Sequence, residues 1–315
     1  MSEHSKNIVL LLLSIIVSLV TANVGLWALR IADPPIYLHD PEIGYMAVPN
    51  QWPSSRGLYY HINHAGLRGP EFSESKQANA YRVVFIGDSV TFGGGAVSDK
   101  DTFVVRVGRS VGQELHSKTD TVNISAPGWG VQNMDAFISR YGLFRADLVI
   151  WMLPYEDFRR PKNFAPGMPT RRQFRLVCLA KHALEMARLR MFDMRGAREG
   201  SSRAPTSHVL EDNLAAFDHA LRLIAKSGAR ALVIFFPMGD TPAVEDKEAY
   251  QSYQAVATRH RIGICDVCPL VEAAGGAALF YDGVHLNSLG HEVTADVVYS
   301  CGRRLLDSSG GAVRR

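Results

Sequence analysis

The sequence lacks a strong net charge. Its 315 residues include 34 Lys or Arg and 31 Asp or Glu, which leaves +3 at pH 7. Nothing in this balance indicates a whole-molecule attraction to nucleic acid, and we predict no nucleic-acid partner. The chain also lacks low-complexity bias, since 47% hydrophobic and 21% charged residues are typical of a globular protein with a sizeable core.

Cysteine is scarce, with Cys178, Cys265, Cys268 and Cys301. Cys265 and Cys268 are spaced Cys-x-x-Cys, but two thiols without a neighbouring His cluster do not make a zinc site. We therefore predict no metal and no cofactor. Cys265 falls in a predicted strand, so we expect it to pack as a small apolar residue, while a disulfide with Cys268 stays open for an exported protein.

Long apolar runs are absent except from Ile8 to Leu29. This run is long enough to cross the roughly 30 Å hydrocarbon core as a helix. Val20-Thr21-Ala22 offers small residues at a possible signal-peptide cut, but the apolar run continues beyond them. We favour an uncleaved anchor in the inner membrane with the catalytic body facing the periplasm or exterior, and a secreted protein is the alternative. Lys6 favours a cytoplasmic N-terminus.

The chain divides into four parts. We assign 1–30 to the anchor or signal peptide, 31–80 to a tether and lead-in, 81–307 to an α/β domain and 308–315 to a tail. The second part is rich in Pro, Tyr, His and Gly and shows no sustained helical period.

The third part alternates short apolar runs with helical stretches, which is the pattern of a parallel sheet with crossover helices. We predict a five-stranded, flavodoxin-like three-layer α/β sandwich. The expected strands are 83–86, 121–124, 148–153, 231–236 and 262–266. The expected helices are 103–115, 132–143, 209–227, 247–260 and 287–306.

A serine stands at the end of the first of these strands. The run Val83–Ile86 ends at Gly87, and Gly87-Asp88-Ser89 turns the chain at the edge where open α/β sheets bind ligands. The glycines of residues 91–95 keep side-chain bulk away. Ser89 is therefore a candidate nucleophile.

An Asp and a His lie near the other end of the chain, at Asp282 and His285, just ahead of the last predicted helix. A carboxylate three residues before an imidazole can hold one ring nitrogen while the other faces a nucleophile. Ser89, His285 and Asp282 therefore make a candidate catalytic triad.

These stretches resemble the SGNH (GDSL-type) hydrolase superfamily, of the exported bacterial type. The first motif reads Gly-Asp-Ser-Val at 87–90 and the last reads Asp-Gly-Val-His at 282–285. The second matches at Asn123 and Gly128, and the resemblance covers about residue 63 to the last helix. The lead-in 63–71 is also similar to exported members, and we expect its Arg68 and Glu71 to be structural.

The third motif departs from the family, in which Gly-x-Asn-Asp is expected. Here the aligned residues are Pro154-Tyr155-Glu156-Asp157. The resemblance implies an oxyanion hole built from the backbone N–H groups of Ser89 and Gly128, with Glu156 where the Asn donor would stand. An ionised Glu156 would repel the oxyanion, whereas a protonated one would donate to it.

The segment 158–205 is a basic insertion. It holds twelve Lys or Arg against three Asp or Glu, with leucines interleaved. Such a segment can lie on an anionic membrane as an amphipathic helix, hold an anionic glycan, or form a solvated surface.

The resemblance implies a serine esterase that acts outside the cytoplasm on an acylated, in particular O-acetylated, glycan or lipid. Two alternatives stay open: an O-acyltransferase that modifies an extracellular polysaccharide with the same triad, and a binding or scaffold protein whose catalytic machinery has decayed. The expected partners are the acylated substrate and the membrane.

Overall fold

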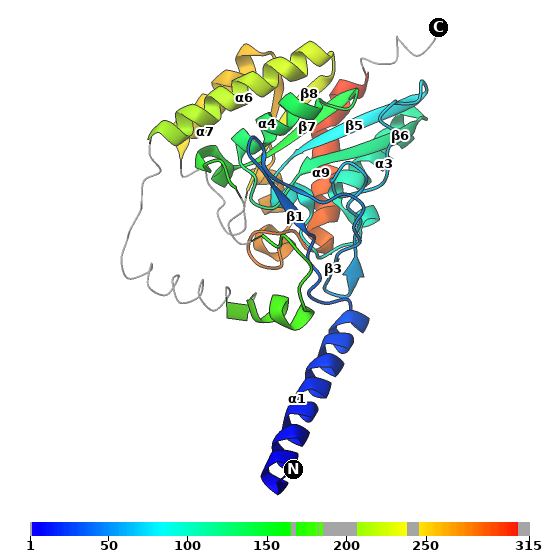
Figure 1. The fold of residues 1–315 in the computed structure, drawn as a ribbon. Coiled ribbons are helices and arrows are strands. Elements are labelled where there is room, and N and C mark those ends of the chain that lie inside the picture. Colours follow the sequence, from blue (N-terminus) through cyan, green and yellow to red (C-terminus); the bar gives the residue numbers. More distant parts are fainter. Residues whose placement is uncertain (1, 165–167, 182, 185–206, 238–245, 308–315) are drawn as a thin grey trace.

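The computed structural model describes residues 2–164, 168–181, 183–184, 207–237 and 246–307 (Figure 1). The predicted tail 308–315 and most of the second half of the basic insertion, 185–205, lie outside the described residues.

The N-terminal helix α1, Glu3–Ala28, projects from the rest of the chain and buries none of its residues (Figure 1). It has 26 residues, and an 18-residue window within it has a mean hydropathy of 2.5, so it is long and apolar enough to span a membrane. It is therefore a candidate signal anchor or signal peptide.

The body is built on a five-stranded parallel sheet, as predicted. The strands are β5 (Ala80–Gly87), β6 (Lys118–Ser125), β7 (Leu148–Pro154), β8 (Arg230–Phe236) and β9 (Gly263–Asp266). Their order across the sheet is β6-β5-β7-β8-β9, which is the flavodoxin-like order. Gly87 pairs with Ser125, so the ends of β5 and β6 meet at one edge.

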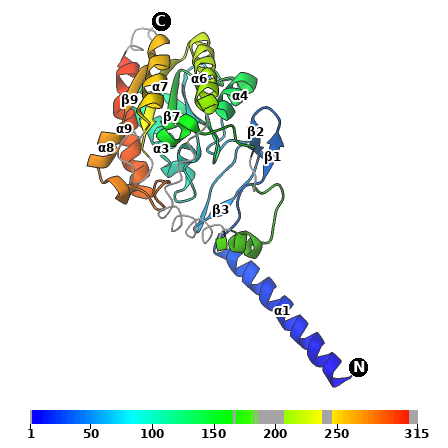
Figure 2. The same cartoon turned by 90° about the vertical axis from the view of Figure 1, so that its left-hand side faces the viewer.

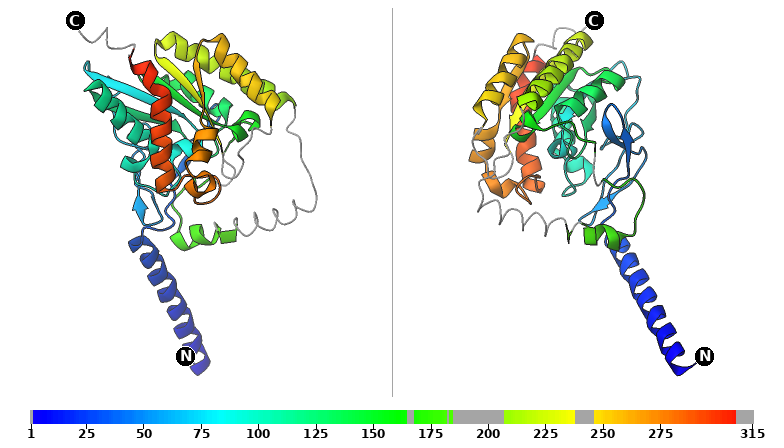
Figure 3. Two further views of the ribbon diagram at one scale, coloured as in Figure 1. Left: turned by 180° about the vertical axis from the view of Figure 1, so that it is seen from behind. Right: turned by 60° about the vertical axis from the view of Figure 1, so that its left-hand side comes forward.

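Helices cover both faces of the sheet, because alternate strand residues point to opposite faces (Figures 2 and 3). Val84 and Ile86 of β5 pack on the side of α4 (Val131–Tyr141), α6 (Ser207–Ser227) and α7 (Lys247–Arg259). Val83 and Phe85 pack on the opposite side, with α3 (Phe103–Leu115), α8 (Cys268–Ala273) and α9 (Ser288–Asp307). The predicted three-layer sandwich is confirmed.

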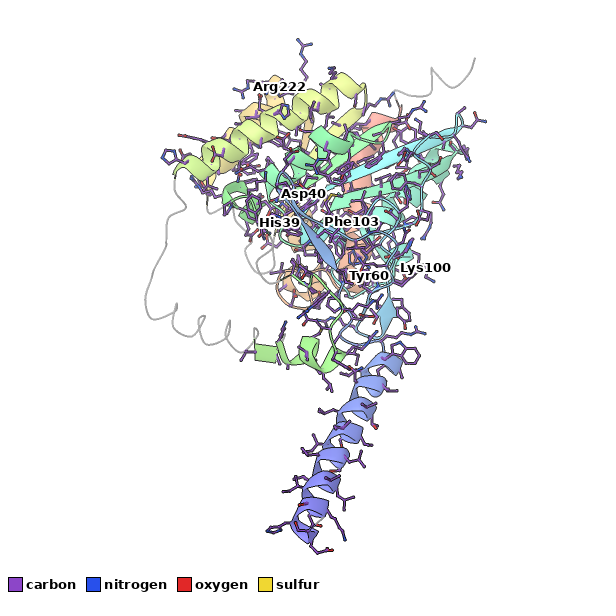
Figure 4. The ribbon with its side chains drawn as sticks, in the orientation of Figure 1. His39, Asp40, Tyr60, Lys100, Phe103 and Arg222 are labelled. Carbon is purple, nitrogen blue, oxygen red and sulfur yellow. A yellow bond between two sulfur atoms is a disulfide. The ribbon has the colours of Figure 1, made fainter. Side chains whose placement is uncertain are left out.

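The lead-in forms two small antiparallel hairpins. The first pairs β1 (Tyr37–Asp40) with β2 (Gly44–Ala47), and the second pairs β3 (Ser54–Ser55) with β4 (Leu58–Tyr59). The first hairpin is tied to the domain because Trp129 Nε1 donates to the Tyr45 carbonyl at 3.1 Å. Figure 4 shows His39 and Asp40 of β1 beside the body, whereas Arg222 of α6 lies at the end remote from α1.

One prediction about cysteine is wrong. Cys265 is not an unpaired packing residue, because it forms a disulfide with Cys301 that joins β9 to α9. The two Cα atoms are 6.2 Å apart, since the last helix packs back beside the last strand. Cys268 is buried and free, and its Sγ donates to the Tyr155 hydroxyl at 2.8 Å.

Candidate active site

Ser89 is the first residue of α2 (Ser89–Phe92), the short helix that follows β5. The turn into it is tight: a Cβ at Gly87 would come within 2.0 Å of Thr91 Oγ1, so only glycine fits. Asp88 caps the helix, and its Oδ1 accepts from the Val90 N–H at 2.9 Å. Ser89 itself is half-buried, so its hydroxyl is reachable at the sheet edge.

Arg68 holds the loop after Ser89 in place. Its side chain is 1% exposed, and its guanidinium pairs with Asp99 Oδ1 at 3.0 Å. The same guanidinium donates at 2.8–3.0 Å to three backbone carbonyls of this loop, those of Phe92, Gly94 and Val97. The lead-in thus fixes the chain beside the candidate nucleophile, which fits the predicted structural role of Arg68.

Asp282 and His285 are hydrogen-bonded to each other. The ring Nδ1 of His285 lies 2.8 Å from Asp282 Oδ2, and Asp282 Oδ1 accepts from the His285 backbone N–H at 2.7 Å. Burial raises the pKa of Asp282, but these hydrogen bonds and the imidazole charge together lower it by more. The net pKa is therefore below its ordinary value. An ionised carboxylate at Nδ1 leaves Nε2 to face a substrate.

The fold brings this pair to the loop that follows Ser89. A Cβ built on Gly94 would lie 3.5 Å from the Cβ of His285, and the Gly94 N–H donates to the Ser89 carbonyl at 3.4 Å. Tyr281 stacks on the His285 ring at 5.8 Å between centroids and fixes its plane. The residues that follow β5 and those of the loop before α9 therefore meet at one edge of the sheet.

Gly128 lies in the loop after β6 with φ +80, a conformation that favours glycine. A Cβ there would stand 3.1 Å from Tyr45 Oη, and the Gly128 carbonyl accepts from Asn163 Nδ2 at 3.1 Å. The other residue of this motif, Asn123, is buried and donates to the Thr91 carbonyl at 2.9 Å. It ties α2 to β6.

The third motif forms η2 (Tyr155–Arg159), a short 3-10 helix after β7. Glu156 is exposed there, whereas the next residue, Asp157, is fully buried. The sequence analysis missed Arg160, one turn further on. Its Nε lies 2.8 Å from Asp157 Oδ1, and its Nη1 lies 3.7 Å from Oδ2 of the buried Asp88 beside Ser89.

The two carboxyl groups around Arg160 are driven toward their neutral forms. Burial raises the pKa of Asp157 well above its usual range, and the neighbouring Asp88 raises it further. Burial also raises the pKa of Asp88, against the lowering effects of Arg160 and His285. The Arg160 guanidinium opposes both shifts, and its contact with Asp88 brings positive charge to the residue before Ser89.

Within the part of the chain that the structure describes, no three His, Cys, Asp or Glu residues gather closely enough to hold a metal ion.

A serine at the carboxyl end of β5 and an Asp–His pair before α9 are the arrangement expected of an α/β ester hydrolase. The sequence matches the GDSL-like lipase/acylhydrolase family over residues 85–293, and the chain belongs to that family. It is a carboxylic ester hydrolase of the SGNH/GDSL type.

Comparison with solved structures finds matches at low identity. A lipase/acylhydrolase from Enterococcus faecalis is 17% identical and matches 71% of this chain and 96% of its own, with a TM-score of 0.44. TesA is 15% identical, with 71% and 99% covered and a TM-score of 0.48. An acetyl xylan esterase from Geobacillus stearothermophilus is 15% identical, with 73% and 96% covered and a TM-score of 0.47. No curated protein sequence matches the chain significantly.

Proposed function

We propose that this chain is an exported serine esterase that removes an acyl group, in particular an acetyl group, from a glycan or lipid outside the cytoplasm. Ser89 is the nucleophile, His285 the general base and Asp282 the residue that orients it. The observation that carries the proposal is the 2.8 Å contact between Asp282 and His285 beside the loop that follows Ser89.

In the first half-reaction His285 Nε2 takes the proton of Ser89 as Oγ attacks the ester carbonyl carbon. The C–O bond to the alcohol then breaks, and the alkoxide leaves with the proton from Nε2. An acyl-enzyme on Ser89 results. Water, activated by the same imidazole, attacks it and restores the serine.

The oxyanion of the tetrahedral intermediate needs donors that are already in place. Ser89 and Gly128 supply backbone N–H groups, as the family resemblance implies. In the family, the Asn of the third motif is a neutral donor to the oxyanion. We propose that Arg160 supplies a positive charge in its place, since Arg160 lies beside Asp88 while Glu156 is exposed.

Two features support export. The unburied apolar helix α1 precedes the body, and Cys265 and Cys301 form a disulfide, a bond that persists mainly outside the cytoplasm. We favour α1 as an uncleaved anchor in the inner membrane, with the catalytic body on the periplasmic side.

The second candidate function is an O-acyltransferase, in which a sugar hydroxyl replaces water at the acyl-enzyme. The same three side chains serve both reactions, so only the acceptor differs. A decayed binding protein is the third candidate, and the intact Asp282–His285 hydrogen bond argues against it.

The decisive experiment compares wild type with Ser89→Ala. We expect wild type to hydrolyse a short-chain aryl acetate and to react with a fluorophosphonate probe, and the variant to do neither while keeping its melting temperature. Labelling of both proteins would remove Ser89 as the nucleophile. Absence of labelling in a folded wild type would favour the decayed protein.

A further inference from the structure

The last described residues of the basic insertion lie against the domain-side end of α1. We call residues 171–184 the collar; its helical part, residues 175–181 and 183–184, lies across the domain-side end of α1 (Figures 1 and 3). The Arg175 backbone N–H donates to Asn23 Oδ1 at 2.8 Å, and its Nη1 donates to the Ile31 carbonyl at 2.8 Å. Arg175 is buried and also pairs with Asp33.

The collar displays apolar side chains instead of burying them. Phe174 is 68% exposed and Leu184 71%, and two tryptophans nearby, Trp27 and Trp52, are also exposed. Arg171, Arg172 and Lys181 are exposed as well, and residues 168–184 contain no Asp or Glu. Aromatic, aliphatic and basic side chains together are the composition of a surface that lies in the headgroup region of an anionic bilayer.

The position of the collar along α1 would place it at the headgroup region of a bilayer that α1 spans. At 1.5 Å per residue, Ile8 to Asn23 spans about 24 Å, and Ile8 to Trp27 about 30 Å. With Ile8 at one edge of a roughly 30 Å hydrocarbon core, Trp27 stands at the other edge and Asn23 about 6 Å inside it. Interfacial helices bury their apolar faces by about 5–10 Å.

A hollow of about 590 Å³ opens between α1, the collar and the lead-in. Trp27, Trp52 and Tyr59 line it together with Arg172 and Phe174. The aromatic walls suit the glycerol and headgroup region of a phospholipid, while Asp33, which also lines the hollow, pairs there with Arg172 and Arg175.

The lead-in connects this surface to the catalytic edge. The Gly57 N–H donates to the Arg30 carbonyl just after α1, at 3.3 Å. Arg56 lies over the Tyr281 ring at 4.0 Å, and Tyr281 stacks on His285. The loop that carries Asp282 and His285 therefore stands on the end of the domain nearest α1 (Figure 1).

We propose that the collar rests on the anionic membrane surface, turns the catalytic edge toward the bilayer, and makes the enzyme act on acylated molecules held in that membrane. The substrate class is thus a lipid or lipid-linked glycan whose ester lies at headgroup level. This proposal rests on the esterase function proposed above.

The test uses the full chain in phosphatidylcholine vesicles with about one third phosphatidylglycerol. Two probes carry the same aryl acetate, one in solution and one on a hexadecyl chain that inserts into the vesicle. We expect Phe174→Glu/Leu179→Glu to lower turnover of the hexadecyl probe about tenfold and that of the soluble probe less than about twofold. Vesicles without phosphatidylglycerol should lower the hexadecyl rate of wild type in the same direction.

Tyr141→Glu is the matched control, because Tyr141 is 46% exposed on α4, away from the collar, and should change neither rate. Equal loss on both probes, or no loss on the hexadecyl probe, overturns the proposal. If Ser89 is needed for hydrolysis of both probes but the collar variant changes neither rate, the esterase function stands and the membrane role is removed.

A second measurement is independent of activity. In a Trp27→Phe variant the remaining tryptophans are Trp52, which is 61% exposed, and the buried Trp129 and Trp151. We expect brominated lipids to quench the Trp52 emission. Unquenched emission places the collar surface outside the bilayer, whatever the rates show.

Discussion

Nη1 of Arg160 lies 3.7 Å from Oδ2 of Asp88, the fully buried residue that precedes the candidate nucleophile. This contact brings a guanidinium from the segment after β7 to the end of β5. No pattern in the sequence indicates it, and we proposed above that its positive charge acts in place of the missing Asn of the third family motif. The first prediction tests whether that charge stabilises the oxyanion.

Replacing the guanidinium should slow catalysis. We expect Arg160→Gln to lower kcat for an aryl acetate about 10²-fold, with little change in KM, because oxyanion stabilisation acts only in the transition state. Arg160→Lys should retain part of the rate, since it keeps the charge without the planar fork. Steady-state kinetics on the purified chain measure both.

Arg159→Gln is the control, because Arg159 is the last residue of η2, next to Arg160, but pairs with Asp246 and Glu248 of the α7 region. Its kcat should stay near wild type. A KM effect without a kcat effect for Arg160→Gln would make Arg160 a substrate-binding residue instead.

Asp282→Asn should leave the fold intact and remove the anion that orients the imidazole. We expect kcat to fall by up to about 10⁴-fold, the loss typical of a triad whose histidine takes the wrong tautomer. The pKa of Asp282 lies below its ordinary value, so in wild type this carboxylate stays ionised down to a pH below the ordinary pKa of an aspartate. A loss of activity at higher pH than that would have to come from another group. A rate within about tenfold of wild type would contradict the triad assignment.

Glu156 is the residue that stands in place of the family Asn. It is exposed on η2, so we expect Glu156→Asn and Glu156→Gln to leave kcat/KM within about threefold of wild type, the range of surface changes that touch no reacting atom. A rise of about tenfold in the Asn variant would instead place a repelling carboxylate in the oxyanion hole. A wild-type rate that falls with rising pH but is flat in the Gln variant would reveal a protonated Glu156.

His291 should make the folded state sensitive to acid. Burial and the nearby positive charges of Arg68 and Arg106 lower the pKa of His291 to about 3, although the carboxylate of Asp101 acts in the opposite direction. Below pH 6.5 His291 is therefore protonated in the unfolded chain but stays neutral in the folded chain until the pH approaches 3. The free energy of unfolding should drop by about 1.4 kcal/mol per pH unit from this one group as pH falls toward 3.

The measurement is urea unfolding at several pH values, with His291→Asn as the comparison. His291 Nδ1 accepts from the Phe103 N–H at 3.2 Å, and an Asn oxygen can replace that acceptor. The variant should lose stability less steeply between pH 6.5 and 4. Equal slopes in the two proteins would show that His291 titrates normally when folded.

The sequence by itself determined the elements and their kind. Short buried strands alternate with amphipathic helices because local periodicity records which residues face the core. All five strands and the longer helices α3, α4, α6, α7 and α9 were therefore predicted to within a few residues, whereas the short helices α2 and α8 were not. Gly87 and Asp88 shape the turn at Ser89 locally, and Asp282 reaches His285 across only three residues. Those features depend only on residues that are close together in the sequence.

The tertiary structure decided which distant residues meet. Cys265 pairs with Cys301 rather than Cys268 because α9 packs back against β9, and the sequence pattern contains no record of that packing. Arg68 supports the loop after Ser89 from a lead-in whose short hairpins carry little periodicity. Arg160 reaches Asp88 because parallel strands end at the same edge, so side chains far apart in the sequence converge there, where burial sets their charge.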